Sequence, residues 1–139
     1  MEKVKNPQLK ILVADDDEGI RSGFAMLFKM YDYQVVVASN GVLALQAFEN
    51  EAFDLVVTDI CMPGGDGLTL IKALKGINKN IRIIAISGGV VPYEDSMDMA
   101  LSLGADVALP KPISTLKLIE VVKHLLEGSG EDLLPAQII

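Results

Sequence analysis

Residues 9–17 have the sequence Leu-Lys-Ile-Leu-Val-Ala-Asp-Asp-Asp, an aliphatic run that stops at three consecutive carboxylates. Three later apolar runs also end at a polar side chain: 53–58 at Asp59, 81–86 at Ser87 and 105–110 at Lys111. Runs of this length and composition are typical of parallel strands that are covered on both faces. Because the carboxyl ends of parallel strands meet at one edge of a sheet, the sequence predicts that these polar groups converge there.

Segments with helical periodicity separate the apolar runs. Between the first run and a second strand predicted at 33–38, apolar residues recur at helical spacing and mark a buried stripe of Ile20, Phe24, Leu27, Phe28 and Tyr31. The later helices are predicted from their capping residues and apolar faces: N-caps at Asn40, Asp66 and Ser114, a C-terminal cap at Gly104, and an apolar face of Met97, Ala100 and Leu101 in the fourth helix.

Five strands that alternate with five helices define an α/β fold class. The handedness of the crossovers and the position of the site favour a doubly wound (βα)5 fold of the flavodoxin-like type, with a parallel five-stranded sheet of order 2-1-3-4-5. One domain is predicted over residues 9–127, preceded by an N-terminal extension at 1–8. The segment 128–139 begins with Gly-Ser-Gly-Glu-Asp and is predicted to be a flexible tail or the stub of a linker.

Composition excludes several classes of function. The net charge of −7 repels nucleic acid, so we expect no nucleic-acid partner for this chain. No apolar run approaches the roughly 20 residues of a membrane-spanning helix, and no secretory leader opens the sequence, so no membrane partner is expected either. The single cysteine, Cys61, is compatible with a reducing compartment. We therefore expect a cytoplasmic protein.

The predicted strand order places Asp15 or Asp16 opposite Asp59, because the first strand lies beside the third. Two carboxylates about 4 Å apart repel each other by roughly 4 kcal/mol at an effective dielectric constant near 20. A group of three needs a cation to be stable. Ligands that are oxygen atoms only are the kind that Mg²⁺ prefers in proteins, so the expected cofactor is Mg²⁺.

Four motifs in this order resemble the receiver domain of two-component response regulators, of the chemotaxis-regulator type. They are Leu-Val-Ala-Asp-Asp at 12–16 with Arg21, Val-Thr-Asp-Ile-Cys-Met-Pro at 57–63 with Gly67, Ile-Ser-Gly at 86–88, and Pro-Lys-Pro at 110–112. The resemblance covers residues 9–127. It implies a module that takes a phosphoryl group from a sensor histidine kinase or a histidine phosphotransfer protein, and that is not a turnover enzyme.

The resemblance also implies a role for each residue of the site. Asp59 is expected to be the phosphoacceptor. Asp16 is expected to bind Mg²⁺ directly and Asp15 through water, with Asp59 and the backbone carbonyl of Cys61 as the remaining protein ligands. Lys111 is expected to pair with Asp59 before transfer and with the phosphoryl group afterwards, and Ser87 to donate a hydrogen bond to that group.

Output is expected at the face formed by the fourth helix, fifth strand and fifth helix, which receivers use for homodimers and for a downstream target or output domain. Receivers generally have an aromatic residue on the fifth strand that moves on phosphorylation, where this chain has Ala108. The conformational change is therefore expected to pass through the 87–93 loop and the fourth helix, with Tyr93 as a candidate mobile aromatic.

The resemblance further implies that the peptide bond Lys111–Pro112 is cis. Arg21 is expected to form a surface salt bridge with a nearby acid.

Two other classes of function compete with this hypothesis. Asp15 and Asp17 follow the first strand as in haloacid-dehalogenase-type phosphatases, but Gly19 stands where that family has Thr or Val, and Asp59 would have no role. A flavodoxin-like nucleotide binder would need a Gly- or Ser/Thr-rich phosphate loop after the first strand. Three aspartates at that place would repel a phosphate.

Overall fold

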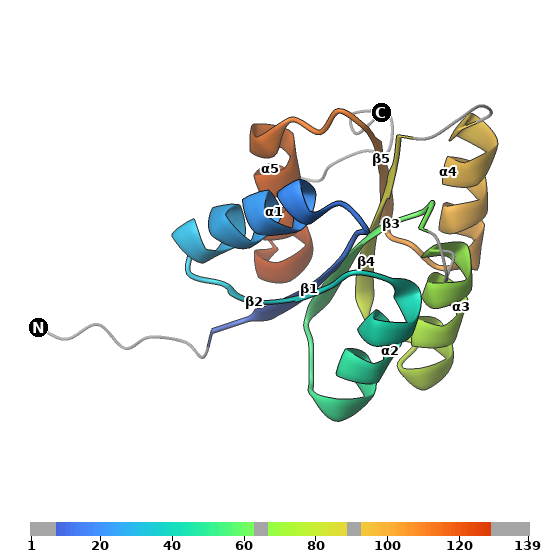
Figure 1. The fold of residues 1–139 in the computed structure, drawn as a ribbon, viewed down its shortest axis with the longest axis horizontal. Coiled ribbons are helices and arrows are strands. Elements are labelled where there is room, and N and C mark those ends of the chain that lie inside the picture. Colours follow the sequence, from blue (N-terminus) through green and yellow to red (C-terminus); the bar gives the residue numbers. More distant parts are fainter. Residues whose placement is uncertain (1–7, 63–66, 89–92, 129–139) are drawn as a thin grey trace, which may run out of the picture.

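The computed structural model describes residues 8–62, 67–88 and 93–128, without the side chains of 93–95. Strands and helices alternate along these residues (Figure 1). The strands are β1 (Lys10–Ala14), β2 (Gln34–Ala38), β3 (Leu55–Asp59), β4 (Arg82–Ser87) and β5 (Val107–Pro110). The helices are α1 (Glu18–Met30), α2 (Gly41–Asn50), α3 (Gly67–Ile77), α4 (Tyr93–Leu103) and α5 (Thr115–Glu127).

The five strands form one parallel sheet of order β2-β1-β3-β4-β5, which confirms the predicted fold class. Helices α1 and α5 cover one face of the sheet, and α2, α3 and α4 cover the other (Figure 1). In the register of the central strands, Ala14 pairs with Thr58 and Asp59 pairs with Ile86. The carboxyl ends of β1, β3 and β4 therefore lie next to one another, as the prediction of a shared edge requires.

Strands β3 and β5 begin two residues later than the apolar runs suggest, because each is preceded by an aspartate that binds the neighbouring strand. The Asp54 carboxylate accepts a hydrogen bond from the N–H of Lys10 at 2.8 Å, and the Asp106 carboxylate accepts one from the N–H of Ile83 at 2.8 Å. These side chains satisfy backbone donors at the amino edge of the sheet, where no further strand residue can do so.

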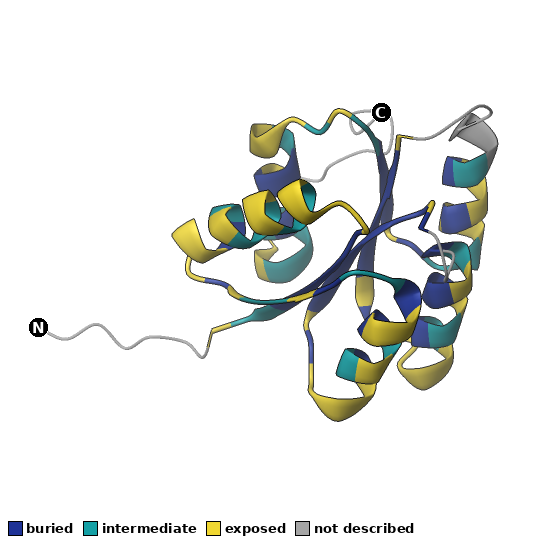
Figure 2. Ribbon diagram, in the orientation of Figure 1, coloured by how far each residue is buried: buried dark blue, intermediate teal, exposed yellow. Residues whose placement is uncertain are grey.

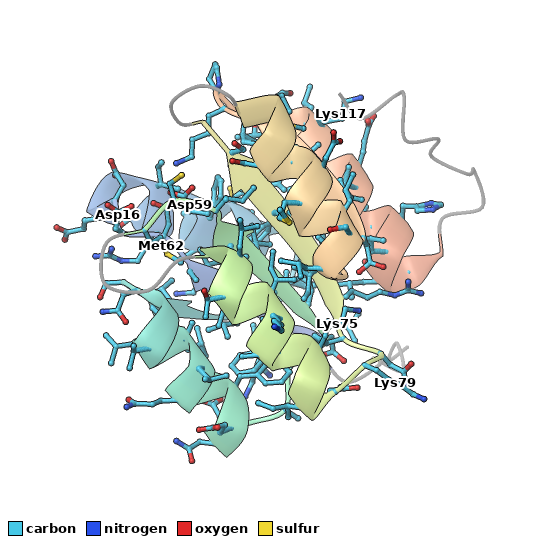
Figure 3. All side chains as sticks on the ribbon, turned by 90° about the vertical axis from the view of Figure 1, so that its right-hand side faces the viewer. Asp16, Asp59, Met62, Lys75, Lys79 and Lys117 are labelled. Atoms are coloured by element: carbon cyan, nitrogen blue, oxygen red, sulfur yellow. The ribbon has the colours of Figure 1, made fainter. Side chains whose placement is uncertain are left out.

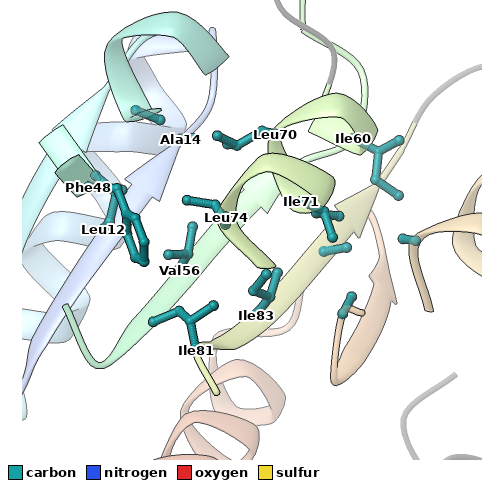
Figure 4. Close-up of a cluster of buried hydrophobic side chains, with 14 of the residues drawn as sticks. Leu12, Ala14, Phe48, Val56, Ile60, Leu70, Ile71, Leu74, Ile81 and Ile83 are labelled. Atoms are coloured by element: carbon teal, nitrogen blue, oxygen red, sulfur yellow. The ribbon is translucent and has the colours of Figure 1, made fainter. Parts of the chain in front are cut away.

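The sheet separates two apolar layers. The inner strands β1, β3 and β4 are almost wholly buried, whereas the edge strand β2 is only partly buried and the outer faces of the helices are exposed (Figure 2). Alternate residues of β1 face opposite layers: Leu12 lies in the layer under α2–α4, and Ile11 lies in the layer under α1 and α5. Aliphatic side chains fill the α2–α4 layer, as Figure 4 shows for Leu12, Val56, Leu70, Leu74 and Ile83. Burial of this kind contributes roughly 1.5–3 kcal/mol per large side chain.

The helix ends agree with most of the predicted caps. Asn40 accepts a hydrogen bond from the N–H of Leu43, and Ser114 accepts one from the N–H of Lys117, so both are N-caps. Gly104 follows α4 with a φ of +124°, a conformation that favours glycine. The predicted cap at Asp66 lies outside the described residues. The Lys111–Pro112 peptide bond is cis, as expected.

Two residues that the periodicity placed in the core are exposed. Tyr31 is the C-cap of α1, so it lies past the last turn of the buried stripe and is 38% exposed. Leu101 is 43% exposed on α4, whereas Met97 and Ala100 of the same predicted face are buried.

Across the part of the chain that the structure describes, the helices are all too short or too polar to cross a lipid bilayer.

Candidate functional site

The predicted carboxylates come together at the carboxyl edge of the sheet. Asp15 follows β1 directly, and Asp59 is the last residue of β3. Asp15, Asp16 and Asp59 each place a carboxylate oxygen within 4.8 Å of the other two. Asp15 and Asp59 are buried, with 1% and 5% of their surface exposed, whereas Asp16 is exposed. Figure 3 shows Asp16 and Asp59 side by side at this edge, at the opposite end of the sheet from Lys75 and Lys79.

Lys111 brings a positive charge to the two buried carboxylates. Its Nζ lies 3.2 Å from Oδ2 of Asp59 and 3.5 Å from Oδ2 of Asp15. The backbone of Lys111 is fixed by a hydrogen bond from its N–H to the carbonyl of Ser87 at 2.9 Å. Its aliphatic stem runs across Gly88, where an added Cβ would lie only 2.4 Å from Cβ of Lys111. The lysine can therefore reach Asp59 only because residue 88 has no side chain.

Burial and charge have opposite effects on the ionisation of this group. Burial raises the pKa of Asp59, the negative charge of Asp15 raises it further, and the Lys111 ammonium and the N–H of Cys61 offset only part of the increase. Burial alone would lower the pKa of Lys111, but the carboxylates of Asp59 and Asp15 outweigh that effect and raise it. The site thus contains more negative charge than its one lysine neutralises, which favours the binding of a cation.

Ser87, the last residue of β4, has a buried hydroxyl with no hydrogen-bond partner among the described residues. Ser87 is only 2% exposed, so water does not readily form a hydrogen bond with its hydroxyl. A buried hydroxyl without a partner costs free energy, and such groups are uncommon in folded proteins. The hydroxyl is therefore free to bind a ligand that enters the site.

The turn between β1 and α1 orients Asp15. Oδ1 of Asp15 accepts a hydrogen bond from the N–H of Asp17 at 2.9 Å, and Asp17 is the N-cap of α1 through the N–H of Ile20. Arg21 donates from Nη1 to the backbone carbonyl of Asp15 at 2.8 Å. The predicted salt bridge of Arg21 is therefore wrong: among the described residues the guanidinium binds a main-chain oxygen and forms no ion pair with an acid.

Comparison with known proteins assigns the family. The family model described as "Response regulator receiver domain" matches residues 11–123. The chain belongs to the response regulator receiver domain family. This match covers the sheet except for its first residue, Lys10, together with all four predicted motifs, and it decides between the receiver hypothesis and the two competing classes.

Individual receivers resemble the chain over most of its length. It is 36% identical over 117 residues to sporulation initiation phosphotransferase F of Bacillus subtilis, which covers 84% of this chain and 93% of that protein. It is 32% identical over 120 residues to the transcriptional regulatory protein CpxR of Escherichia coli, covering 86% of this chain and 50% of CpxR. A CheY-like receiver domain structure from Methanospirillum hungatei superposes with a TM-score of 0.82 at 26% identity, covering 88% and 96% of the two chains.

The receiver therefore has a phosphoacceptor role in two-component signalling. It matches nearly the full length of the first relative but spans only about half of CpxR. The family implies interactions with kinases and with output domains.

Two glycines contribute to the receiver's site in a way that sequence reasoning did not explain, although both lie in the quoted motifs. Gly88 leaves space for Lys111, and Gly67 leaves space for the backbone of Asp59. An added Cβ at Gly67 would lie 2.0 Å from the carbonyl oxygen of Asp59. The N–H of Cys61 donates to Oδ1 of Asp59 at 3.2 Å, so the chain after β3 also contacts the carboxylate. The sequence signal was a glycine in each of two motifs, but the contact that each glycine makes possible is with a residue elsewhere in the chain and depends on long-range packing.

Proposed function

We propose that Asp59 is the residue of this receiver that accepts the phosphoryl group. The observation that carries the assignment is the position of its carboxylate, which is buried at the carboxyl edge of the sheet in contact with the Lys111 ammonium and close to the carboxylates of Asp15 and Asp16. One oxygen of Asp59 contacts Lys111 and the other accepts the N–H of Cys61, so the nucleophile is oriented from both sides. Orientation and charge neutralisation are the main requirements of phosphoryl transfer.

In the proposed reaction an oxygen of Asp59 attacks the phosphorus of a phosphohistidine on a kinase or phosphotransfer protein. The new O–P bond makes an acyl phosphate, and the N–P bond breaks with its electron pair returning to the imidazole. Lys111 then transfers its contact from Asp59 to a phosphoryl oxygen. Ser87 donates its unpartnered hydroxyl to another. The chain modifies itself and keeps the group, so it acts as a switch and not as a turnover enzyme.

The acidic cluster fits Mg²⁺ in charge and in donor type, since three carboxylates supply oxygen atoms only. Asp16 and Asp59 would hold the ion directly, Asp15 would hold it through water, and the backbone carbonyl of Cys61 would complete the protein ligands. When bound, Mg²⁺ neutralises negative charge on the phosphoryl oxygens. The exposure of Asp16 supports this assignment, because an ion that keeps several waters needs an open side.

Incubation with acetyl phosphate and Mg²⁺, followed by intact-protein mass spectrometry, tests the assignment. Wild type should gain the mass of one phosphoryl group, and Asp59→Asn should gain none. Asp98→Asn is the matched control, because it makes the same change at an exposed position of α4. Uptake by Asp59→Asn at the wild-type rate would show that another residue is the acceptor.

We infer that the output surface is formed by α4, β5 and α5, and that it binds a downstream protein, an output domain or a second copy of the chain. Met99 and Leu101 support this, because both are large apolar side chains exposed on α4, at 51% and 43%. Ala108 is 5% exposed on β5 and has no ring that could move between two positions. Tyr93 begins α4, and its side chain lies outside the described residues.

Beryllofluoride with Mg²⁺ tests this route, because it imitates the phosphoryl group without a covalent bond. Backbone amide NMR shifts should change along α4 and β5 as well as at Asp59. Changes confined to the ends of β1, β3 and β4 would show that the signal leaves the domain by another surface. The receiver unit proposed to carry out these steps is residues 9–127, and the elements from Lys10 to Glu127 support that boundary.

A further inference from the structure

We propose that Arg21 is a positioning residue of the metal site, which holds the β1–α1 turn so that Asp16 presents its carboxylate toward Asp59. The inference rests on the proposed Mg²⁺ site. The contact that carries it is the hydrogen bond from Nη1 of Arg21 to the backbone carbonyl of Asp15, at 2.8 Å. That carbonyl belongs to the peptide that joins Asp15 to Asp16, so its orientation sets the direction in which the Asp16 side chain leaves the backbone.

Within the described part of the chain, Asp16 has no other support of its own. Asp15 is held by its N–H, which donates to the carbonyl of Ala38 at 3.1 Å, and by its side chain, which contacts Asp17 and Lys111. The Asp16 side chain is exposed and, among the described residues, makes no hydrogen bond or ion pair. Its position therefore depends on the backbone of the turn.

Arg21 is well placed to control that backbone. Its own N–H donates to the carbonyl of Asp17 at 3.0 Å in the first turn of α1, and its side chain returns to Asp15. Arg21 therefore binds the backbone carbonyls on both sides of Asp16, those of Asp15 and Asp17. A hydrogen bond from a charged donor is roughly twice as strong as a neutral one, so the guanidinium holds the carbonyl more firmly than a water would.

The positive charge of Arg21 weakens the binding of a metal ion, whereas its positioning of the turn strengthens it. A guanidinium close to the acidic cluster repels Mg²⁺, whereas a fixed turn favours binding by holding a ligand in place. Because Arg21 contacts a neutral carbonyl and, in the described ranges, no carboxylate, its geometry favours positioning over neutralisation. The two effects differ in sign, so a measurement of Mg²⁺ affinity separates them.

The experiment compares Arg21→Met with Lys29→Met by calorimetric titration with Mg²⁺. Both variants remove one positive charge from α1, but Lys29 lies in the last turn, at the other end of the helix. Loss of a group that orients a metal ligand typically costs about tenfold to a hundredfold in affinity. We expect a loss of that size for Arg21→Met and a dissociation constant close to wild type for Lys29→Met.

Arg21→Lys provides a second variant, which keeps the charge but not the planar fork, and should lie between wild type and Arg21→Met. It also keeps the test valid if Arg21→Met does not fold. At saturating Mg²⁺ the rate of phosphorylation by acetyl phosphate should return close to wild type in both variants, because the ligands themselves are intact.

Equal or tighter Mg²⁺ binding by Arg21→Met would overturn the inference, and so would a rate that stays low at saturating Mg²⁺, since Arg21 would then act on the phosphoryl donor. Absence of Mg²⁺ binding by wild type, or wild-type binding by Asp16→Asn, would instead contradict the proposed metal site.

Discussion

At the scale of single residues, the buried Asp59 carboxylate destabilises the fold while no cation is bound. Its pKa is raised, mainly by burial and then by Asp15, so the folded chain holds this proton more tightly than the unfolded chain does. In metal-free buffer at neutral pH, Asp59→Asn should therefore raise the free energy of unfolding by on the order of 1 kcal/mol. Lys111 keeps Asp15 as a partner in the variant.

The sign of this effect gives it a definite pH dependence. The advantage of Asp59→Asn should be complete above the raised pKa of Asp59 and should shrink as the pH falls toward the ordinary carboxyl value, because wild type then protonates Asp59 in the folded state. Urea unfolding at several pH values measures it, with Asp98→Asn as the control. An advantage that grew as the pH fell would contradict the raised pKa.

Gly88 should be as important for phosphoryl transfer as a charged residue, because its lack of a side chain leaves the space through which Lys111 reaches Asp59. In Gly88→Ala the new Cβ would lie 2.5 Å from Cδ of Lys111 and displace the stem of the lysine. We expect at least a tenfold slower phosphorylation by acetyl phosphate, with Mg²⁺ affinity retained because the carboxylates do not move. Gly23→Ala on α1, where a Cβ meets nothing within 4 Å, should leave the rate unchanged. A wild-type rate in Gly88→Ala would show that Lys111 does not depend on this path.

At the scale of elements, α3 is packed against the backbone of Asp59, the proposed phosphoacceptor. Gly67→Ala would place a Cβ 2.0 Å from the carbonyl oxygen of Asp59 and 2.7 Å from Cα of Ile60, and neither backbone atom can move without shifting β3. We expect a loss of about 1–3 kcal/mol in the free energy of unfolding. Gly76→Ala in the same helix has open space and should be stabilising by up to about 1 kcal/mol. Equal effects in thermal melts would show that the start of α3 tolerates a side chain.

The elements also show which features a sequence can predict. The strands and their order followed from the aliphatic runs, and Asp59, Ser87 and Lys111 followed from the ends of those runs, because strand ends of a parallel sheet share one edge. The sequence did not predict features that depend on the exact end of a helix or on which of several groups a side chain binds. Tyr31 lies just past α1, and Arg21 binds a carbonyl although several acids are near in sequence. Periodicity identifies the face of a helix, but only packing decides such contacts.

At the scale of the whole molecule, the proposed metal site would couple ion binding to the stability of the entire sheet. Asp15 and Asp16 follow β1, and Asp59 ends β3, so an ion held by them joins two neighbouring central strands. Because the cluster is assembled only in the folded chain, bound Mg²⁺ shifts the equilibrium toward folding.

At a free Mg²⁺ concentration a hundred times its dissociation constant, the gain should be about 2.7 kcal/mol, which raises the melting temperature by several degrees over a sample with chelator. Asp16→Asn removes a proposed ligand that is exposed and leaves the buried core intact, so it should melt close to metal-free wild type and respond weakly to Mg²⁺. Differential scanning calorimetry of both proteins, with and without chelator, measures the coupling. An equal Mg²⁺-dependent rise in the two proteins would mean that the ion acts on the general negative charge of the chain, because a specific site must lose affinity when one of its ligands is removed.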